Sequence, residues 1–248
     1  ALLKSMASDP FWGVRKESAS AFSKLKSKKY KKELMQLVQG QDNRVKRVLF
    51  RCLGNYEGDK DVAKFLTKVI ETETNYYAIA DAFTALIKVD SIAAEKKVDI
   101  LLNRDSFNDV IRLSAISYFG SVISSRNYER LKQICSYGGT TWDARSAALK
   151  QLEKYIKIKP RTIDLFVEYL SDPNRSMRAV AINALGKFGN NNHIGFLDDL
   201  AEQDPILSRY VRVAKGKIKK PDDEKNLIER KEIIELNRKL DEIRKILQ

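Results

Sequence analysis

The hydrophobic positions of this chain fall at helical spacing, in paired segments that polar turns separate. Between residues 161 and 173, RTIDLFVEYLSDP, apolar side chains recur every three or four positions from Ile163 to Leu170. The following segment, NRSMRAVAINALGKFG, carries a second apolar stripe from Met177 to Leu185. This spacing predicts two amphipathic helices joined by an Asp-Pro turn.

The helix pairs repeat with a fixed period. One position near the start of each second helix recurs six times; the first separation is 31 residues and the next four are 33 each. Seven positions further on, every second helix carries Phe or Leu. Because one repeat is too short to bury its own apolar face, neighbouring repeats must stack. The residues at the recurring position are Arg15, Lys46, Ile79, Arg112, Arg145 and Arg178.

The pattern predicts an all-α fold, a right-handed α-solenoid of about six helix pairs over residues 1–221. Five prolines and eleven glycines in 248 residues agree with a helical chain. A C-terminal amphipathic helix is predicted over 222–248, where Leu240 lies in a heptad seam. We expect this helix to dock on the last repeat, with weak self-association through the seam as the alternative. The second helices should begin near Pro10, Arg44, Asn75, Asn108, Trp142 and Pro173.

The repeats follow the order Asp-Pro, Val-Arg or its equivalent, Ala, and then Leu-Gly. Through this order the chain resembles the HEAT family of α-solenoids over residues 1 to about 220. In that family a cation at the start of the inner helix pairs with the turn of a neighbouring repeat. The resemblance therefore implies structural roles, bonded to turn carbonyls or to aspartates such as Asp9, Asp42 and Asp172. The residues concerned, called the ladder residues below, are Arg15, Lys46, Arg112, Arg145 and Arg178. In the third repeat Ile79 replaces the cation, and we expect Tyr76 and Tyr77 to fill that turn.

The stretch DPFWGVRKESA, residues 9–19, resembles the C-terminal HEAT-like region of bacterial M1-family zinc aminopeptidases. The resemblance implies an accessory region that frames access for peptides and contacts an upstream catalytic domain of the same chain. Phe11 and Trp12 would then lie at an interface near that domain. Since the chain begins without Met, we expect it to be part of a longer protein.

The residues for zinc hydrolysis are missing from this sequence. An M1 peptidase needs a His-Glu-x-x-His helix and a further Glu, which leave one zinc position open for water. This chain has one histidine, His193, in the polar segment GNNNHIGFLDDL. We therefore expect no catalysis, cofactor or metal in this chain, and zinc only in the upstream domain.

The charge of the chain leaves two other functions open. Lys and Arg exceed Asp and Glu by 46 to 33, and a basic surface can attract phosphates or acidic proteins. One alternative is a HEAT-type scaffold that binds a protein or peptide. The other resembles the HEAT-like DNA alkylpurine glycosylases, through Trp12, Trp142 and Asp143. Because Trp142 and Asp143 precede an inner helix, we do not expect nucleic acid as the partner. The candidate basic patch is Lys24, Lys26, Lys28, Lys29, Lys31 and Lys32.

The two cysteines and the hydropathy bear on the compartment. Cys52 and Cys135 lie in apolar helical patterns without metal or redox spacing, which predicts buried free thiols. Free thiols favour the cytoplasm. No apolar run approaches the roughly 20 residues that a bilayer crossing needs, so we expect no membrane insertion.

Overall fold

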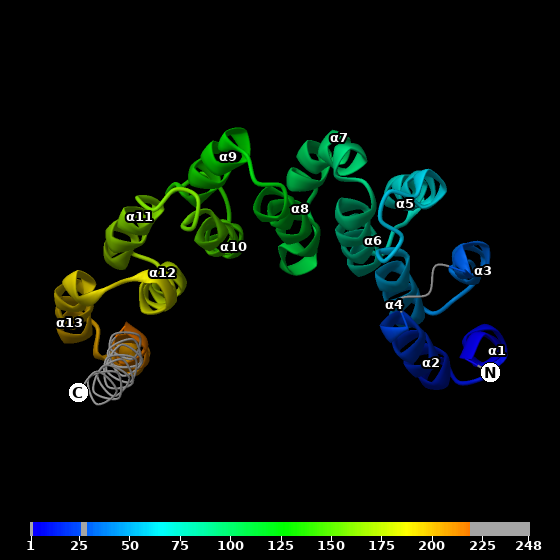
Figure 1. Cartoon of the computed structure of the whole chain (residues 1–248), viewed down its shortest axis with the longest axis horizontal. Helices are drawn as coiled ribbons and strands as arrows, with labels where there is room; N and C mark the ends of the chain where they lie inside the picture. The colour runs from blue at the N-terminus through cyan, green and yellow to red at the C-terminus, as the bar shows by residue number, and fades with distance from the viewer. Residues whose placement is uncertain (1, 26–28, 219–248) are drawn as a thin grey trace, which may run out of the picture. The chain divides into compact units, whose positions relative to one another are not determined.

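The chain folds into a series of antiparallel helix pairs (Figure 1). The computed structural model describes residues 2–25 and 29–218, and these contain helices and turns without a strand. The prediction of an all-α solenoid is therefore confirmed. The predicted helix over 222–248, including Leu240, lies outside the described residues.

The helices of the first five repeats form two layers within the segment that ends at Leu152. The outer helices are α1 (Leu2–Ser8), α3 (Lys31–Leu37), α5 (Lys60–Thr72), α7 (Ser91–Leu102) and α9 (Ser125–Cys135). The inner helices are α2 (Trp12–Lys24), α4 (Asn43–Leu53), α6 (Tyr76–Val89), α8 (Val110–Ser121) and α10 (Trp142–Leu152). Each inner helix packs directly on the next inner helix.

A second compact unit begins at Glu153. It contains α11 (Thr162–Glu168), α12 (Arg175–Phe188), α13 (Ile194–Gln203) and a helix over 208–218. Short 3-10 turns connect these helices: η2 (Glu153–Tyr155), η3 (Tyr169–Ser171), η4 (Asn191–His193) and η5 (Pro205–Leu207). Another, η1 (Phe107–Asp109), precedes α8 in the first unit. The division between the units falls inside the segment that the sequence predicts to be one solenoid.

The predicted helix starts agree with the structure to within two residues. The predicted number of repeats is too low, because α13 and the helix over 208–218 form a seventh pair. Val211 lies 33 positions after Arg178 and is buried, as Ile79 is in the third repeat. Within the described residues, the repeating cation is therefore replaced by a buried aliphatic side chain in two of seven repeats.

Small residues let neighbouring inner helices approach closely. Ala115, Ala148 and Ala181, three positions after the ladder arginines, are fully buried. A Cβ atom at Gly186 would lie 2.8 Å from the Cα of Ala214, which leaves no room for a side chain. The period in the sequence is therefore also a period in the packing.

The turns before four of the inner helices, α2, α4, α12 and the helix over 208–218, share one hydrogen bond. The side chain of the turn aspartate accepts the backbone N–H two residues further on, and this Asx bond leaves the aspartate carbonyl free to accept another donor. The pairs are Asp9 with Phe11, Asp42 with Arg44, Asp172 with Asn174 and Asp204 with Ile206, at 2.8 to 3.2 Å. The turn before α8 differs, because Asn108 and Asp109 both adopt left-handed backbone conformations, with φ of 52° and 54°.

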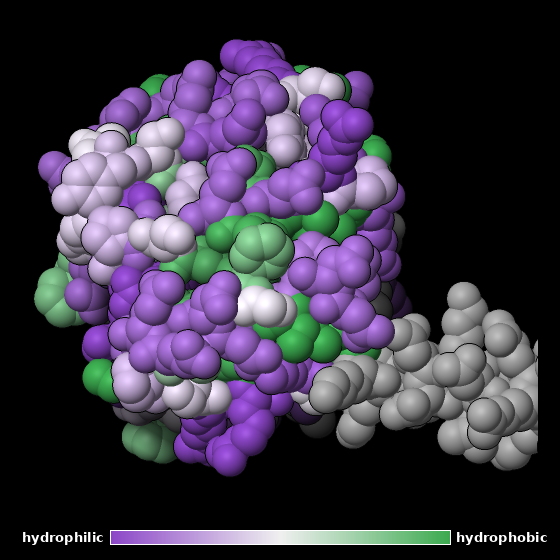
Figure 2. All heavy atoms as spheres, turned by 90° about the vertical axis from the view of Figure 1, so that its left-hand side faces the viewer, coloured by the Kyte–Doolittle hydropathy of each residue, from purple (hydrophilic) through white to green (hydrophobic). Residues whose placement is uncertain are grey.

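Hydrophilic side chains dominate the face of the molecule drawn in Figure 2, where apolar atoms show as patches between them. In the second unit the exposed large apolar side chains include Phe196, Ile206 and Val213. Scattered exposed apolar residues of this kind are normal on a folded surface.

We expect Gly186→Ala to lower the free energy of unfolding by about 1–3 kcal/mol, because the new methyl group overlaps the backbone at Ala214. The matched control is Gly195→Ala in α13, where a Cβ meets open space. There alanine should raise stability, by up to about 1 kcal/mol, through its better helix propensity. Urea denaturation measures both changes, and equal stabilisation by the two substitutions would contradict the packing argument.

Candidate protein-interaction surface

The ladder arginines reach back to the turn that precedes their own helix. Arg15 Nη1 donates to the carbonyls of Asp9 at 2.6 Å and Pro10 at 3.1 Å. Arg178 Nη1 makes the same contacts with Asp172 at 2.6 Å and with the following proline at 3.2 Å. In both turns the arginine Nη1 donates to backbone carbonyls, while the side chain of the aspartate accepts a backbone N–H.

The same cations also reach forward to the turn of the next repeat. Arg15 Nε donates to Gln41 Oε1 at 2.9 Å, and Arg178 Nη2 donates to Asp204 Oδ2 at 2.7 Å. Lys46 Nζ donates to Glu73 Oε2 at 3.0 Å. Asp42, one of the aspartates expected as acceptors, accepts the backbone N–H of Arg44 and caps α4.

Arg112 and Arg145 each donate a hydrogen bond to a backbone carbonyl of their own repeat. Arg112 donates to the Leu102 carbonyl at 2.9 Å and also to Asp109, which accepts a bond from Thr141 as well. Arg145 is only 1% exposed, and its Nε donates to the carbonyl of Cys135 at 2.8 Å. A buried guanidinium of this kind needs such acceptors to offset its lost hydration.

Electrostatics at the turns favours the ionised carboxylates. Hydrogen bonds from Arg178 and Arg175 hold the pKa of Asp204 below its usual range. Burial alone would raise the pKa of Glu73, but hydrogen bonds from the Asn75 backbone N–H and from Lys46 outweigh it, and the net shift is downward.

Exposed aromatic side chains gather where the inner helices begin. We call the set the aromatic edge, and three of its members, Trp12, Tyr76 and Trp142, lie three positions before the recurring residue of their repeat. Phe11 is 58% exposed, Phe107 62% and Tyr137 70%. The complete set is Phe11, Trp12, Tyr76, Tyr77, Phe107, Tyr137 and Trp142.

Arginines stack against this edge and connect it across three repeats. The guanidinium of Arg44 lies 3.9 Å from the ring centroid of Trp12, and that of Arg47 lies 5.0 Å from the ring of Tyr77. Both arginines come from α4, whereas the rings come from α2 and α6. Arg47 is also held by Asp81, with its Nε 2.5 Å from Oδ2.

In the third repeat, where Ile79 replaces the cation, the two tyrosines do not both fill the turn as expected. Ile79 is fully buried, and Tyr77 is half-buried beneath Arg47. Tyr76 remains 36% exposed, with its ring centroid 5.3 Å from that of Tyr77. Only Tyr77 therefore packs inward at this turn.

In the fifth repeat the edge includes a ladder residue. The Arg145 guanidinium lies 5.5 Å from the ring of Tyr137 and 5.2 Å from that of Trp142. Such cation–π contacts hold large rings in one orientation while leaving part of their surface exposed.

Comparison with known proteins places this architecture in a family. The family model for HEAT repeats matches residues 1–87 and 128–214, which is more than half of the chain. The chain belongs to the HEAT repeat family. The HEAT match leaves out residues 88–127, which hold α7, α8 and the turn with the two left-handed residues.

A solved structure with a similar fold is also found. A chain in the structure of the complex of CpcE and CpcF of phycocyanin lyase from Nostoc sp. PCC7120 is 16% identical to this HEAT chain. The match covers 88% of this chain and 92% of that chain, with a TM-score of 0.51. An engineered protein is 18% identical over 88% of this chain and 97% of its own, with a TM-score of 0.35. None of the curated proteins matches this chain.

The predicted basic patch is not one free cationic surface in the HEAT structure. Lys31 Nζ lies 2.8 Å from Asp59 and 2.9 Å from Asp61, and the hydrogen bond that Lys31 donates to Asp59 raises the pKa of Lys31. Lys29 lies over the ring of Tyr30 at 5.6 Å. Lys24 and Lys32 are exposed, whereas Lys26 and Lys28 lie outside the described residues.

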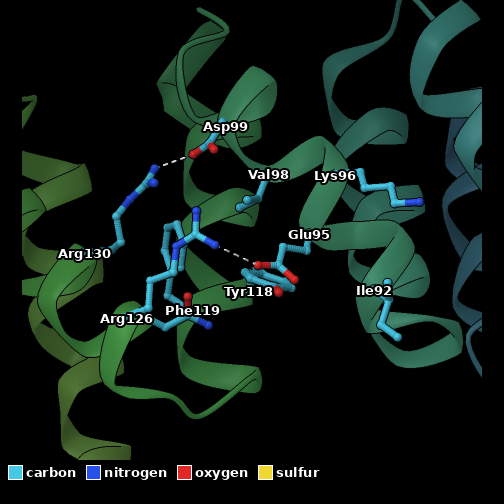
Figure 3. A pocket seen from close by; sticks show the side chains of 10 residues that line it. Ile92, Glu95, Lys96, Val98, Asp99, Tyr118, Phe119, Arg126 and Arg130 are labelled. Atoms are coloured by element: carbon cyan, nitrogen blue, oxygen red, sulfur yellow. Dashed lines mark hydrogen bonds and ion pairs between the residues drawn. The ribbon is translucent and has the colours of Figure 1, made fainter.

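A small pocket of about 180 Å³ lies between the outer helices α7 and α9 (Figure 3). Arg126 points to Glu95 across it, with Nη1 3.2 Å from Oε1, and Arg130 points to Asp99. Tyr118 of α8 lies close to the Arg126–Glu95 pair in this view. Because the charged groups bind one another, the pocket is a weaker candidate site than the aromatic edge.

The remaining predicted groups have structural surroundings. Cys52 and Cys135 are free and buried, as predicted, and burial raises the pKa of the Cys52 thiol. His193 Nδ1 accepts the backbone N–H of Asn190 in the turn before α13.

Within the described ranges no group of three or more His, Cys, Asp or Glu side chains could hold a metal ion. No described helix has both the length and the apolar character to cross a bilayer.

The sequence analysis identified Phe11 and Trp12 as interface candidates but missed the other aromatic members. A signal for them was present, since Tyr76 and Trp142 occupy the same register position as Trp12. Phe107 and Tyr137 lack this signal, because the turns before α8 and α10 differ in length and conformation from the Asp-Pro turns.

We expect Arg145→Ala to destabilise the chain by about 2–3 kcal/mol, because it leaves the buried carbonyl of Cys135 without its charged donor. Arg51→Ala, at an exposed position of α4, should change stability by less than about 0.5 kcal/mol. Thermal unfolding followed by circular dichroism measures both. Equal melting temperatures would argue against a structural role for this ladder residue.

Acid should weaken the turn at Asp204. Because the folded-state pKa of Asp204 is lowered, its ionisation contributes stability above its unfolded pKa of about 3.9, and this contribution is lost as pH falls through the folded value. The melting temperature of Asp204→Asn should therefore fall less steeply below about pH 4 than that of the wild type. Asp199→Asn, at an exposed position of α13, should leave the wild-type slope unchanged.

Proposed function

We propose that this chain is a HEAT-repeat scaffold that binds a protein partner through the aromatic edge. The observation that carries the proposal is the placement of exposed aromatic rings at the starts of inner helices, with arginines stacked on them. Trp, Tyr and Arg are the residue types enriched at the energetic centres of protein interfaces.

The geometry suits binding because the rings are already held in place. Arg44 stacks on Trp12 at 3.9 Å, and Arg47 is fixed between Tyr77 and Asp81. A partner would therefore order few side chains on binding, which lowers the entropic cost of association. Members of the edge come from several repeats, and the arginine contacts connect those of the first three.

The finer interpretation, an accessory region of an M1 aminopeptidase, has no support from the family match or the similar structures. The similar CpcE–CpcF structure is a complex of two chains, which provides a fold-level analogy for assembly with another protein. Nucleic acid is the competing ligand, since bases also stack on aromatic rings. Glu17, Asp81 and Asp143 lie on the inner helices that carry these rings and would oppose phosphates.

The test compares capture of proteins from the source cells by immobilised full chains. We expect a protein that the wild type retains and that Phe11→Ser/Tyr76→Ser loses, because both substituted rings are exposed and their removal opens no core cavity. The captured protein is then purified, and calorimetric titration should show at least tenfold weaker binding to the double variant.

The matched control is Ile92→Ser/Ile100→Ser, which removes two side chains of α7 that are 70% and 65% exposed. This control should bind the purified protein as the wild type does. Equal loss in both double variants, or retention of a nucleic acid in place of a protein, would rule out the proposed function.

A further inference from the structure

Ion pairs join successive outer helices in the first unit. They connect α3 to the start of α5, α7 back to α5, and α9 back to α7. The pairs are Lys31 with Asp59 and Asp61, Lys97 with Glu71, Arg126 with Glu95 and Arg130 with Asp99. Cations that face a neighbouring outer helix are thus generally matched by carboxylates.

Four lysines between α5 and α7 depart from this rule. They line a groove of about 730 Å³, and all four are exposed. Among the described residues, no hydrogen bond or ion pair engages their ammonium groups. We call Lys60, Lys64, Lys68 and Lys96 the groove lysines.

Their spacing works against the stability of α5. Lys60, Lys64 and Lys68 follow one another at intervals of four residues, so they share one face of the helix and repel each other. Like charges four residues apart destabilise a helix, and a destabilising feature without a compensating contact is typical of functional positions. Lys96 adds a fourth charge from α7, and Figure 3 shows it extending away from the ion pairs on the other side of that helix.

The floor and the ends of the groove define what could fill it. Ala63 and Ala93 line it with small apolar side chains, and the Thr67 hydroxyl is already bonded to the Ala63 carbonyl at 2.8 Å. Glu71, paired with Lys97 at 2.5 Å, and Asp90, which caps α7, also line the groove. The groove therefore presents free positive charge over a small apolar floor, with carboxylates beside it.

We infer that this groove binds an acidic peptide segment of a protein partner. The lysines of α5 span eight residues, about 12 Å of helix, which matches carboxylates spaced over two turns of a helical peptide. A nucleic acid is the less suitable ligand, because its continuous phosphate backbone would run past the lysines onto Glu71 and Asp90. The groove belongs to the outer layer, so this site is distinct from the aromatic edge.

Fluorescence anisotropy with the full chain tests the inference. The probe is a fluorescein-labelled, alanine-based helical peptide of 16 residues with glutamates at three positions four apart. A peptide with glutamines at those positions and a 16-nucleotide single-stranded DNA are the comparison ligands. We expect the acidic peptide to bind the wild type at least tenfold more tightly than the glutamine peptide, and more weakly as salt is raised.

Lys64→Glu separates binding from folding. The new carboxylate would lie one turn from both Lys60 and Lys68, so the melting temperature should stay the same or rise while affinity for the acidic peptide falls at least tenfold. Lys150→Glu, an equal charge change at an exposed position of α10, should retain wild-type affinity.

Three results would overturn the inference. These are equal affinity of Lys64→Glu and Lys150→Glu for the acidic peptide, equal binding of the two peptides to the wild type, and DNA binding that depends on Lys64 more than peptide binding does. Each can occur whether or not the aromatic edge binds a protein, because the two tests use different ligands and variants.

Discussion

The solenoid depends on one interaction, a cation at the start of an inner helix that bonds to two turns at once. In the first and sixth repeats the guanidinium reaches the carbonyls of its own turn and an acceptor in the next turn. In the same two turns the aspartate side chain accepts a nearby backbone N–H while its carbonyl accepts the guanidinium. Charge-assisted bonds of this kind are the stronger class of hydrogen bond in proteins.

Departures from this arrangement coincide with the features that carry the proposals. The third repeat replaces the cation with buried Ile79, and its two tyrosines join the aromatic edge. The fifth repeat keeps Arg145 but buries it between Tyr137 and Trp142. In these two repeats, residues near the start of the inner helix therefore serve both the packing and the exposed surface.

The repeat architecture could be predicted from the sequence because its signals are local and recur. The period and the apolar stripes located six of the seven inner helices in the described residues, and the resemblance to HEAT repeats was correct. Partner choice could not be predicted, as Lys46 shows, because a lysine of that length can reach either Asp42 or Glu73. Val211 was missed for a different reason: an aliphatic residue at the ladder position looks like any other core residue.

The candidate surfaces were harder to predict because they depend on which residues of separate repeats come together. Phe11 and Trp12 stood out as an unusual pair, but their connection to Tyr77 requires Arg44 and Arg47 of the repeat between them. The basic run near residue 30 was visible in the sequence, yet Lys31 is occupied by two aspartates. The bonds that join one repeat to the next link residues 26 to 34 positions apart, whichever repeat is considered. Contacts between successive repeats therefore close loops of similar length in every part of the chain. Folding can start in any neighbouring pair of repeats, and the folding rate need not fall as repeats are added.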